Sequence, residues 1–224
     1  STCKDDRKRK YFLKTIVMSI FKVLEKNIEK RAEDFSEYLS DLKGDTLKGS
    51  EFIFFFFFNI FGDKTIDELE SGIVDSSYRK ETYDFGIDAV YITGAGNIIE
   101  RIEQLETYNE DTRFIIHIFQ FKRGKGIEQA DLLKFKNGIE KVLINEDLSD
   151  TDNLYFYNRM LELNEVKSEI FQQFTTDNIK VHCHIVFGGL ETNLLNNKIL
   201  SEEFEKIKFL LQNGGFVNSE VIVT

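Results

Sequence analysis

Two short segments of the chain carry residue types that phosphodiester chemistry uses. The first, at positions 83–92, has Asp88 at the start of an apolar, β-prone run, and the second, at positions 114–122, is a mostly apolar strand that ends in Gln120 and Lys122. Hydrolysis of a phosphodiester needs a divalent cation held against the phosphate, an activated water and stabilisation of the developing negative charge. Oxygen ligands for Mg²⁺ and one lysine form a minimal site of this kind.

Strand geometry decides which of these side chains can meet. Gln120 and Lys122 are two positions apart on the expected strand, so both side chains leave the same face, whereas His117 points to the other face. A strand pair would place Asp88 beside Gln120. Burying an ammonium group is costly unless it is paired, and a site shared with Asp88 and a metal-bound phosphate would pair Lys122. Taken singly, Asp88 could be a simple strand-start residue and the other two a solvent-reaching strand end; taken together and in this order, they favour a site.

The residues Phe85-Gly-Ile-Asp-Ala-Val90, followed by Phe119-Gln-Phe-Lys122, resemble the Asp…Gln-x-Lys variant of the PD-(D/E)XK nuclease superfamily, as in Mrr-like restriction endonucleases. They are more similar still to the N-terminal nuclease-like region of the abortive-infection, phage-resistance proteins called AIPR. The specific match covers about residues 83–124, and the order of helices extends it more loosely over about 50–224. The resemblance implies a restriction-endonuclease-like αβββαβ core, an Mg²⁺ or Mn²⁺ cofactor, and hydrolysis of DNA in prokaryotic defence against phage.

The resemblance also implies roles for individual residues. Asp88 would be a metal ligand, Gln120 would replace the usual second acidic ligand, and Lys122 would polarise the attacking water and steady the phosphorane. The superfamily often adds a glutamate from the first core helix, for which Glu51 is the candidate and Glu37 the runner-up.

Two departures from the family pattern keep a second function open. Glutamine is a weaker metal ligand than glutamate because it brings no charge, and the role of Asp84, where relatives often have a polar or acidic residue, is open. The alternative to an active enzyme is a catalytically inactive nuclease-fold module that binds nucleic acid or oligomerises.

The distribution of charge is uneven along the chain. The net charge of −10 argues against a surface coated in positive charge. Between positions 114 and 143, however, six Lys and Arg residues stand against three Asp and Glu residues, which is typical of a local nucleic-acid face. DNA is therefore the expected partner, with a homodimer as a compatible state, and the residues expected to contact DNA are Arg123, Lys125, Gln129 and Lys134.

Periodicity predicts helices alternating with strands, which is typical of an α/β sheet. The expected helices cover about residues 10–42 (one helix or two), 51–61 (with Ser50 as N-cap and Gly62 as its end), 66–74 (behind a capping box at Thr65–Glu68), 127–144, 154–174 and 201–212. A polar loop is expected from Asp75 to Thr82, and strands over 87–92, 98–105, 114–122, 179–187 and 217–223. We expect a helical segment over 1–49 to pack on a nuclease domain over 50–224 that includes a C-terminal α/β extension.

Composition and missing motifs narrow the setting. The chain has only two cysteines, which are far apart in sequence, so a disulfide framework is not expected and a cytoplasmic location is. The apolar run at 52–61 has about half the length that a membrane helix needs, so we expect it to be a buried core helix, without a membrane partner. His182 and His184 share one strand face, but no nearby carboxylate or second cysteine completes a metal set, so ordinary packing is expected there. No Walker loop or dinucleotide fingerprint supports an NTPase or a dehydrogenase.

Overall fold

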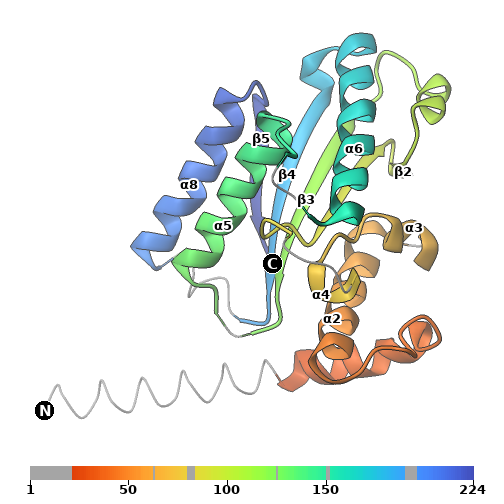
Figure 1. Ribbon diagram of the computed structural model, residues 1–224, viewed down its shortest axis with the longest axis vertical. Coiled ribbons are helices and arrows are strands. Elements are labelled where there is room, and N and C mark those ends of the chain that lie inside the picture. The colour runs from red at the N-terminus through yellow and green to blue at the C-terminus, as the bar shows by residue number, and fades with distance from the viewer. Residues whose placement is uncertain (1–21, 63, 80–83, 125, 150–151, 190–195) are drawn as a thin grey trace, which may run out of the picture.

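The computed structural model describes residues 22–62, 64–79, 84–124, 126–149, 152–189 and 196–224. A five-stranded mixed sheet in the order β2-β1-β3-β4-β5 runs through its centre (Figure 1). Neighbours β2, β1 and β3 are antiparallel, whereas β4 is parallel to β3 and β5 is parallel to β4. The strands are β1 Ala89–Gly94, β2 Asn97–Ile99, β3 Phe114–Lys122, β4 Ile179–Phe187 and β5 Asn218–Val223. The predicted α/β class is thus confirmed.

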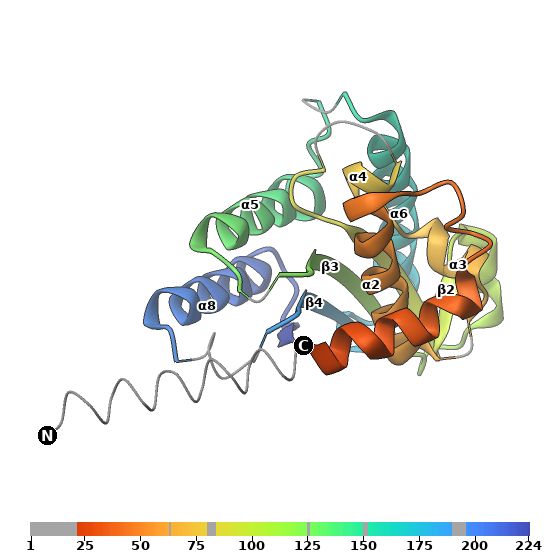
Figure 2. The same ribbon diagram turned by 90° about the horizontal axis from the view of Figure 1, so that it is seen from below.

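Helices cover both faces of this sheet (Figures 1 and 2). The α-helices are α2 Gly44–Phe61, α3 Ile66–Ser71, α4 Ser76–Arg79, α5 Gln129–Ile139, α6 Leu154–Gln173 and α8 Lys198–Asn213. Residues 22–32 are also helical, and shorter turns of helix are η1 Glu33–Phe35, η2 Ile102–Thr107, the π-helix η3 Glu140–Ile144 and η4 Thr176–Asn178.

Alternation along β3 divides the core into two layers. Ile116 and Ile118 join the apolar cluster built by α5, α6 and α8, whereas Phe119 packs in a second cluster with α2 and with the segment that follows residue 22. Because side chains of a strand alternate between faces, Gln120 points toward the α5 layer and Phe121 toward α2. The predicted bounds of β3 and β4 are confirmed, and most residues of both strands are apolar and buried.

The Phe-rich run is core, as predicted. Phe54 and Phe57 of α2 are fully buried, and the ring of Phe57 meets the ring of Phe119 edge to face at 5.2 Å. Ile28 and Phe35 from the preceding segment belong to the same cluster. Within the described residues, no helix combines the length and the apolar character needed to cross a membrane.

The start of α2 was predicted wrongly. The helix begins at Gly44 with Lys43 as N-cap, so residues 44–50, which precede the predicted start at 51, are also helical. Ser50 is not a cap, because its hydroxyl donates to Thr46 O at 2.9 Å inside the helix. The expected boundary between 49 and 50 therefore falls within one continuous helix.

Other element ends confirm or correct the sequence-based expectations. The capping box of Thr65 and Glu68 and the helix end at Gly62 are confirmed. The loop expected at 75–82 contains α4, and the strand expected over 98–105 ends at Ile99, because the chain turns into η2. The helix expected over 127–144 divides into α5 and the π-helix η3. The expected helical residues 10–21 lie outside the described part of the chain.

Candidate functional site

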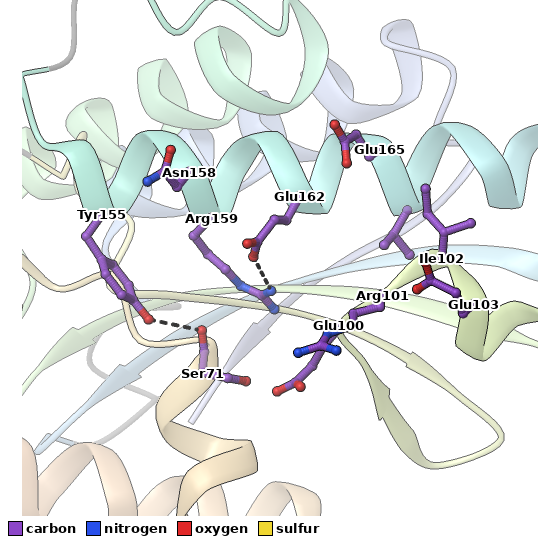
Figure 3. Close-up of a pocket in the computed structure, with 11 residues that line it drawn as sticks. Ser71, Glu100, Arg101, Ile102, Glu103, Tyr155, Asn158, Arg159, Glu162 and Glu165 are labelled. Atoms are coloured by element: carbon purple, nitrogen blue, oxygen red, sulfur yellow. Dashed lines mark hydrogen bonds and ion pairs between the residues drawn. The ribbon is translucent and has the colours of Figure 1, made fainter.

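The described residues line at least three hollows beside the sheet. One, between α8 and β5, has no predicted site residue in its lining, and of the other two only the smaller has any. The larger, about 540 Å³, lies between α6 and the segment after β2 (Figure 3). Its lining carries four glutamates against two arginines, Arg101 and Arg159, and Arg159 pairs with Glu162 at 3.3 Å. This acidic lining is unfavourable for a polyanion. The smaller hollow, about 220 Å³, lies between α2 and the sheet and is lined in part by Asp75, Asp88 and Arg123.

Asp88 is held where the chain enters the sheet, immediately before β1. Its backbone N–H donates to Phe119 O at 2.8 Å. Its carboxylate Oδ2 accepts from the backbone N–H of Phe121 at 2.5 Å, a donor that lies beyond the last β1–β3 residue pair. The carboxylate thus takes the place of a ladder acceptor, and the side chain is only 9% exposed.

The backbone carbonyl of Asp88 positions a second aspartate. This oxygen accepts hydrogen bonds from the N–H groups of Val74 and Asp75, each at 2.9 Å. Asp75 in turn accepts the backbone N–H of Tyr78 through Oδ1 at 2.6 Å, at the start of α4. Two segments that are remote in sequence are therefore joined at Asp88.

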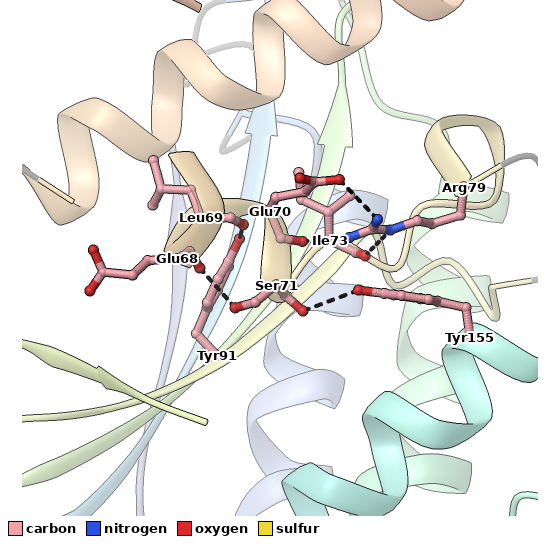
Figure 4. A network of polar contacts seen from close by, with 8 residues as sticks. All are labelled: Glu68, Leu69, Glu70, Ser71, Ile73, Arg79, Tyr91 and Tyr155. Atoms are coloured by element: carbon pink, nitrogen blue, oxygen red, sulfur yellow. Dashed lines mark hydrogen bonds and ion pairs between the residues drawn. The ribbon is translucent and has the colours of Figure 1, made fainter. Parts of the chain in front are cut away.

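A polar network fastens the segment from α3 to α4 that carries Asp75 (Figure 4). The guanidinium of Arg79 donates to Ile73 O at 3.0 Å and to Glu70 O at 2.6 Å, and it pairs with the Glu70 carboxylate at 3.1 Å. It also lies over the ring of Tyr155 in α6, 4.0 Å from the centroid. The hydroxyl of Tyr91 in β1 donates to Leu69 O. These contacts hold Asp75 in place against the sheet.

Asp84 is positioned by a tight turn that contains Gly86. Ile87 N–H donates to Asp84 O at 3.0 Å, and Phe85 and Gly86 between them have φ values of 55° and 75°, as a type I′ turn requires. The Asp84 Oδ1 atom accepts from Gly86 N–H and from Lys134 Nζ of α5, both at 2.9 Å. The buried carboxylate is thereby tied to helix α5.

Asp75, Asp84 and Asp88, the acidic trio, bring one carboxylate oxygen each to within 4.8 Å of the others. Burial, followed by the charges of Asp75 and Asp84, raises the pKa of Asp88 well above its ordinary value, although the hydrogen bond from Phe121 N–H acts in the opposite direction. Oxygen ligands at this spacing suit a hard divalent cation. The role of Asp84, left open by the sequence, is membership of this trio.

Gln120 and Lys122 meet at the first turn of α5, as their common strand face predicts. The Gln120 amide donates to Asp131 O at 3.3 Å, and Lys122 Nζ pairs with the Asp131 carboxylate at 2.7 Å. Gln120 is 3% exposed, and its Oε1 has no hydrogen-bond partner in the described structure. A buried acceptor without a donor calls for a partner such as a cation or a water.

The predicted helix glutamate does not join this group. The hollow beside Asp88 is lined from α2 by Ser50 and its neighbours, and the lining that the described residues form does not include Glu51. Burial and the charge of Glu29 raise the pKa of Glu51, which Arg123 lowers. The runner-up, Glu37, is exposed in the turn after η1.

The four residues expected to contact DNA have different surroundings. Arg123 pairs with Glu25 at 2.8 Å and lines the smaller hollow. Gln129 donates to Glu203 at 3.0 Å, and Lys134, whose side chain is 39% exposed, is bound to Asp84. Lys125 lies outside the described residues.

Sequence reasoning missed two contributors to the site, Asp75 and Asp131. Asp75 was read as part of a polar loop, and only the pairing of Val74 with Asp88 brings it near the sheet. Asp131 is the third helical residue of α5 and accepts the Glu128 N–H at 3.1 Å, so a capping pattern Glu-x-x-Asp was the available signal. Comparisons with protein families, curated proteins and solved structures found no match.

Proposed function

We propose that this chain is a metal-dependent nuclease that hydrolyses DNA phosphodiester bonds through a PD-(D/E)XK-type site on a restriction-endonuclease-like fold. The observation that carries the proposal is the acidic trio at the end of the sheet, next to the strand end that bears Gln120 and Lys122. The element order also supports it, because helix α2, strands β1 to β3, helix α5 and strand β4 occur in that order, with α3 and α4 before β1 and α6 before β4 as additional α-helices.

The donor set fits an Mg²⁺ or Mn²⁺ ion. Asp88, with Asp84 or Asp75, would hold it, and Gln120 Oε1 is a buried acceptor with no donor within the described residues. Clustered buried carboxylates repel one another unless protons or a cation compensate their charge. A bound divalent ion would supply positive charge at the scissile phosphate and increase the acidity of a coordinated water.

Lys122 would be available to a phosphate in spite of its ion pair. The amine is on a side chain that is 41% exposed, and Asp131 is 24% exposed. A pair this close to solvent contributes only about 0–1 kcal/mol, so exchange of the Asp131 carboxylate for a phosphate oxygen costs little. Lys122 would then polarise the attacking water and balance the charge that develops on the phosphate.

The setting in phage defence follows only from the resemblance of the two motifs to AIPR proteins. Two observations favour the alternative, an inactive nuclease-fold module: both Lys122 and Lys134 are bound to acids, and Glu51 belongs neither to the acidic trio nor to the lining of the hollow beside Asp88 that the described residues form. Cleavage assays separate the two functions, because an inactive module binds DNA without cutting it.

The test is cleavage of plasmid DNA, single-stranded DNA and RNA, each with Mg²⁺, with Mn²⁺ and with EDTA. The wild type is compared with Asp88→Asn and Lys122→Met. Matched controls are Asp111→Asn, which removes an exposed charge before the opposite end of β3, and Lys208→Met on the exposed side of α8. Metal-dependent cleavage that is lost in the two site variants and kept in the controls supports the proposal. Cleavage that survives Asp88→Asn, or binding without any cleavage, overturns it.

A further inference from the structure

The three histidines of the chain gather on the face of the sheet that α2 covers. In the parallel pairing of β3 with β4, His117 is opposite His182 and Phe119 is opposite His184. In the pairing of β4 with β5, His182 is opposite Glu220. Because paired residues of neighbouring strands project to the same side, the register places all three imidazoles and one carboxylate on one face.

His117, His182 and His184, the histidine trio, bring one ring nitrogen each to within 4.8 Å of the others. His117 Nδ1 and His184 Nε2 are 3.0 Å apart, and the other ring nitrogen of His117 lies 3.1 Å from the Thr93 hydroxyl. Two imidazole nitrogens bound to one tetrahedral Zn²⁺ at about 2.0–2.1 Å are roughly 3.3 Å apart. Little movement would therefore be needed to place an ion between these rings.

The nitrogens of the trio are in the protonation state that a metal ion requires. Burial, with the neighbouring histidines, lowers the pKa of His117 well below its ordinary value and lowers that of His184 to about 3. Neutral imidazole keeps a lone pair for coordination. The fold satisfies these nitrogens incompletely: His184 Nδ1 and His182 Nε2 are buried, and neither has a hydrogen-bond partner among the residues that the structure describes.

We infer that the histidine trio is a binding site for one divalent transition ion of the Zn²⁺ or Co²⁺ kind, with the Glu220 carboxylate as its fourth ligand. Glu220 Oε2 is 3.9 Å from His182 Nε2, and its side chain is the exposed member of the set. Thr93 would accept the N–H of His117 and fix the orientation of that ring, as outer-shell partners do.

The position of this site indicates a structural ion. His117 and His184 are 7% and 5% exposed, and the ring of Phe61 from α2 meets the His117 ring edge to face, with 5.2 Å between the ring centroids. With four protein ligands the coordination sphere is closed, which is typical of structural zinc. The ion would join β3, β4 and β5 without taking part in the proposed DNA cleavage, so neither proposal depends on the other.

The test is a titration with Co²⁺ of tag-free protein that has been stripped of metal with EDTA and transferred to a buffer with excess Mg²⁺. Tetrahedral Co²⁺ gives strong visible absorption bands that octahedral Co²⁺ on oxygen ligands does not. We expect these bands to saturate at about one ion per chain, to bleach on addition of Zn²⁺, and to be accompanied by a higher midpoint of thermal unfolding. The absence of such bands in folded protein overturns the inference.

Variants assign the bands to particular residues. His182→Gln changes the least buried histidine, so the fold is expected to survive, and circular dichroism checks this. We expect it to weaken Co²⁺ affinity by more than the roughly 10–100-fold loss expected for the isosteric outer-shell change Thr93→Val. Asp88→Asn should leave the bands unchanged. Bands that persist in His182→Gln, or that disappear in Asp88→Asn, place the ion elsewhere and contradict the inference.

Discussion

The acidic trio and the histidine trio both gather three ligand atoms within 4.8 Å on one sheet, but they are assembled by opposite means. The aspartates come from two loop segments, Asp75 from the one before α4 and Asp84 and Asp88 from the one before β1, and are held by hydrogen bonds that involve the backbone of Asp88, Gly86 and Tyr78. The histidines come from two central strands and meet through strand register alone. Loop-built sites rely on many local contacts, whereas a register-built site is as stable as the sheet.

Burial acts on the two clusters in opposite directions. It raises the pKa of Asp88 and lowers the pKa of His117, because in each case it disfavours the charged form. The histidine trio is neutral, so without a ligand its rings do not repel one another, and its only cost is the buried nitrogens that lack a partner among the described residues. The acidic trio accumulates like charge, which a bound cation would relieve. A cation bound at the acidic trio should therefore stabilise the fold more than a cation bound at the histidine trio.

The largest expected effect is that of Asp88→Asn on DNA cleavage. Loss of a direct metal ligand should lower the rate by at least the roughly 100-fold seen when outer-shell partners are removed. The folded protein should not be weakened in EDTA, because the asparagine oxygen can still accept the Phe121 N–H and one repelling charge is gone. Plasmid cleavage and urea unfolding measure the two quantities. A large loss of stability would mean that the charge itself is structural.

Gly138→Ala should weaken the loop-built cluster alone. A Cβ atom at Gly138 would come within 2.4 Å of Phe85 O, so α5 and the turn that holds Asp84 must move apart. Overpacking of this kind costs about 1–3 kcal/mol of unfolding free energy, and Mn²⁺ affinity should fall with it while the Co²⁺ bands of the histidine trio remain. The same exchange at Gly49 in α2, where a Cβ atom meets nothing within 4 Å, should be neutral or stabilising by up to about 1 kcal/mol. Equal effects at the two positions would refute this account.

The contrast between the clusters also explains what could be predicted from sequence. Strands β3 and β4 were predicted to the residue because most of their residues are apolar and β-prone, and Asp88, Gln120 and Lys122 stand at or next to the ends of such strands. The start of α2 was missed because its first turns are polar and half exposed.

Contacts between remote segments could not be predicted. Asp75 reaches the site through the carbonyl of Asp88, and nothing in its local sequence indicates this pairing. The pattern His-x-His at 182–184 was noted, but the missing ligands, His117 and Glu220, come from neighbouring strands. A single sequence does not specify which strands are adjacent or in which register.

The pH dependence of stability should separate the clusters in metal-free protein. The folded pKa of His184 is depressed to about 3, below its ordinary value near 6.5, so its contribution is present above pH 6.5 and is lost as the pH falls toward 3. Each histidine that is buried in its neutral form makes the free energy of unfolding fall by up to about 1.4 kcal/mol for each pH unit below its ordinary pKa. Asp88 acts in the opposite sense, since its raised pKa makes the fold less stable as the pH rises through that value. Urea unfolding in EDTA at several pH values should show that the free energy of unfolding falls less steeply at acid pH in His184→Gln than in the wild type. The charged residues beside His182, Glu220 and Lys180, are the same in both proteins. An unchanged acid-side slope would show that the imidazoles are not buried as neutral groups.

The smallest expected effect is that of Asp131→Asn, which releases Lys122 without changing either trio. The half-exposed ion pair contributes about 0–1 kcal/mol, and the asparagine oxygen can still accept the Glu128 N–H at the start of α5. Stability should therefore change by no more than about 1 kcal/mol. Freed from its competitor, Lys122 should increase DNA affinity by up to about 5-fold at low salt, since that ratio corresponds to about 1 kcal/mol. Fluorescence anisotropy with labelled DNA measures the change against Asp111→Asn, which removes the same charge away from the site. If both variants bind DNA with the same gain, only net charge has acted, and Lys122 is not the residue that meets the phosphate.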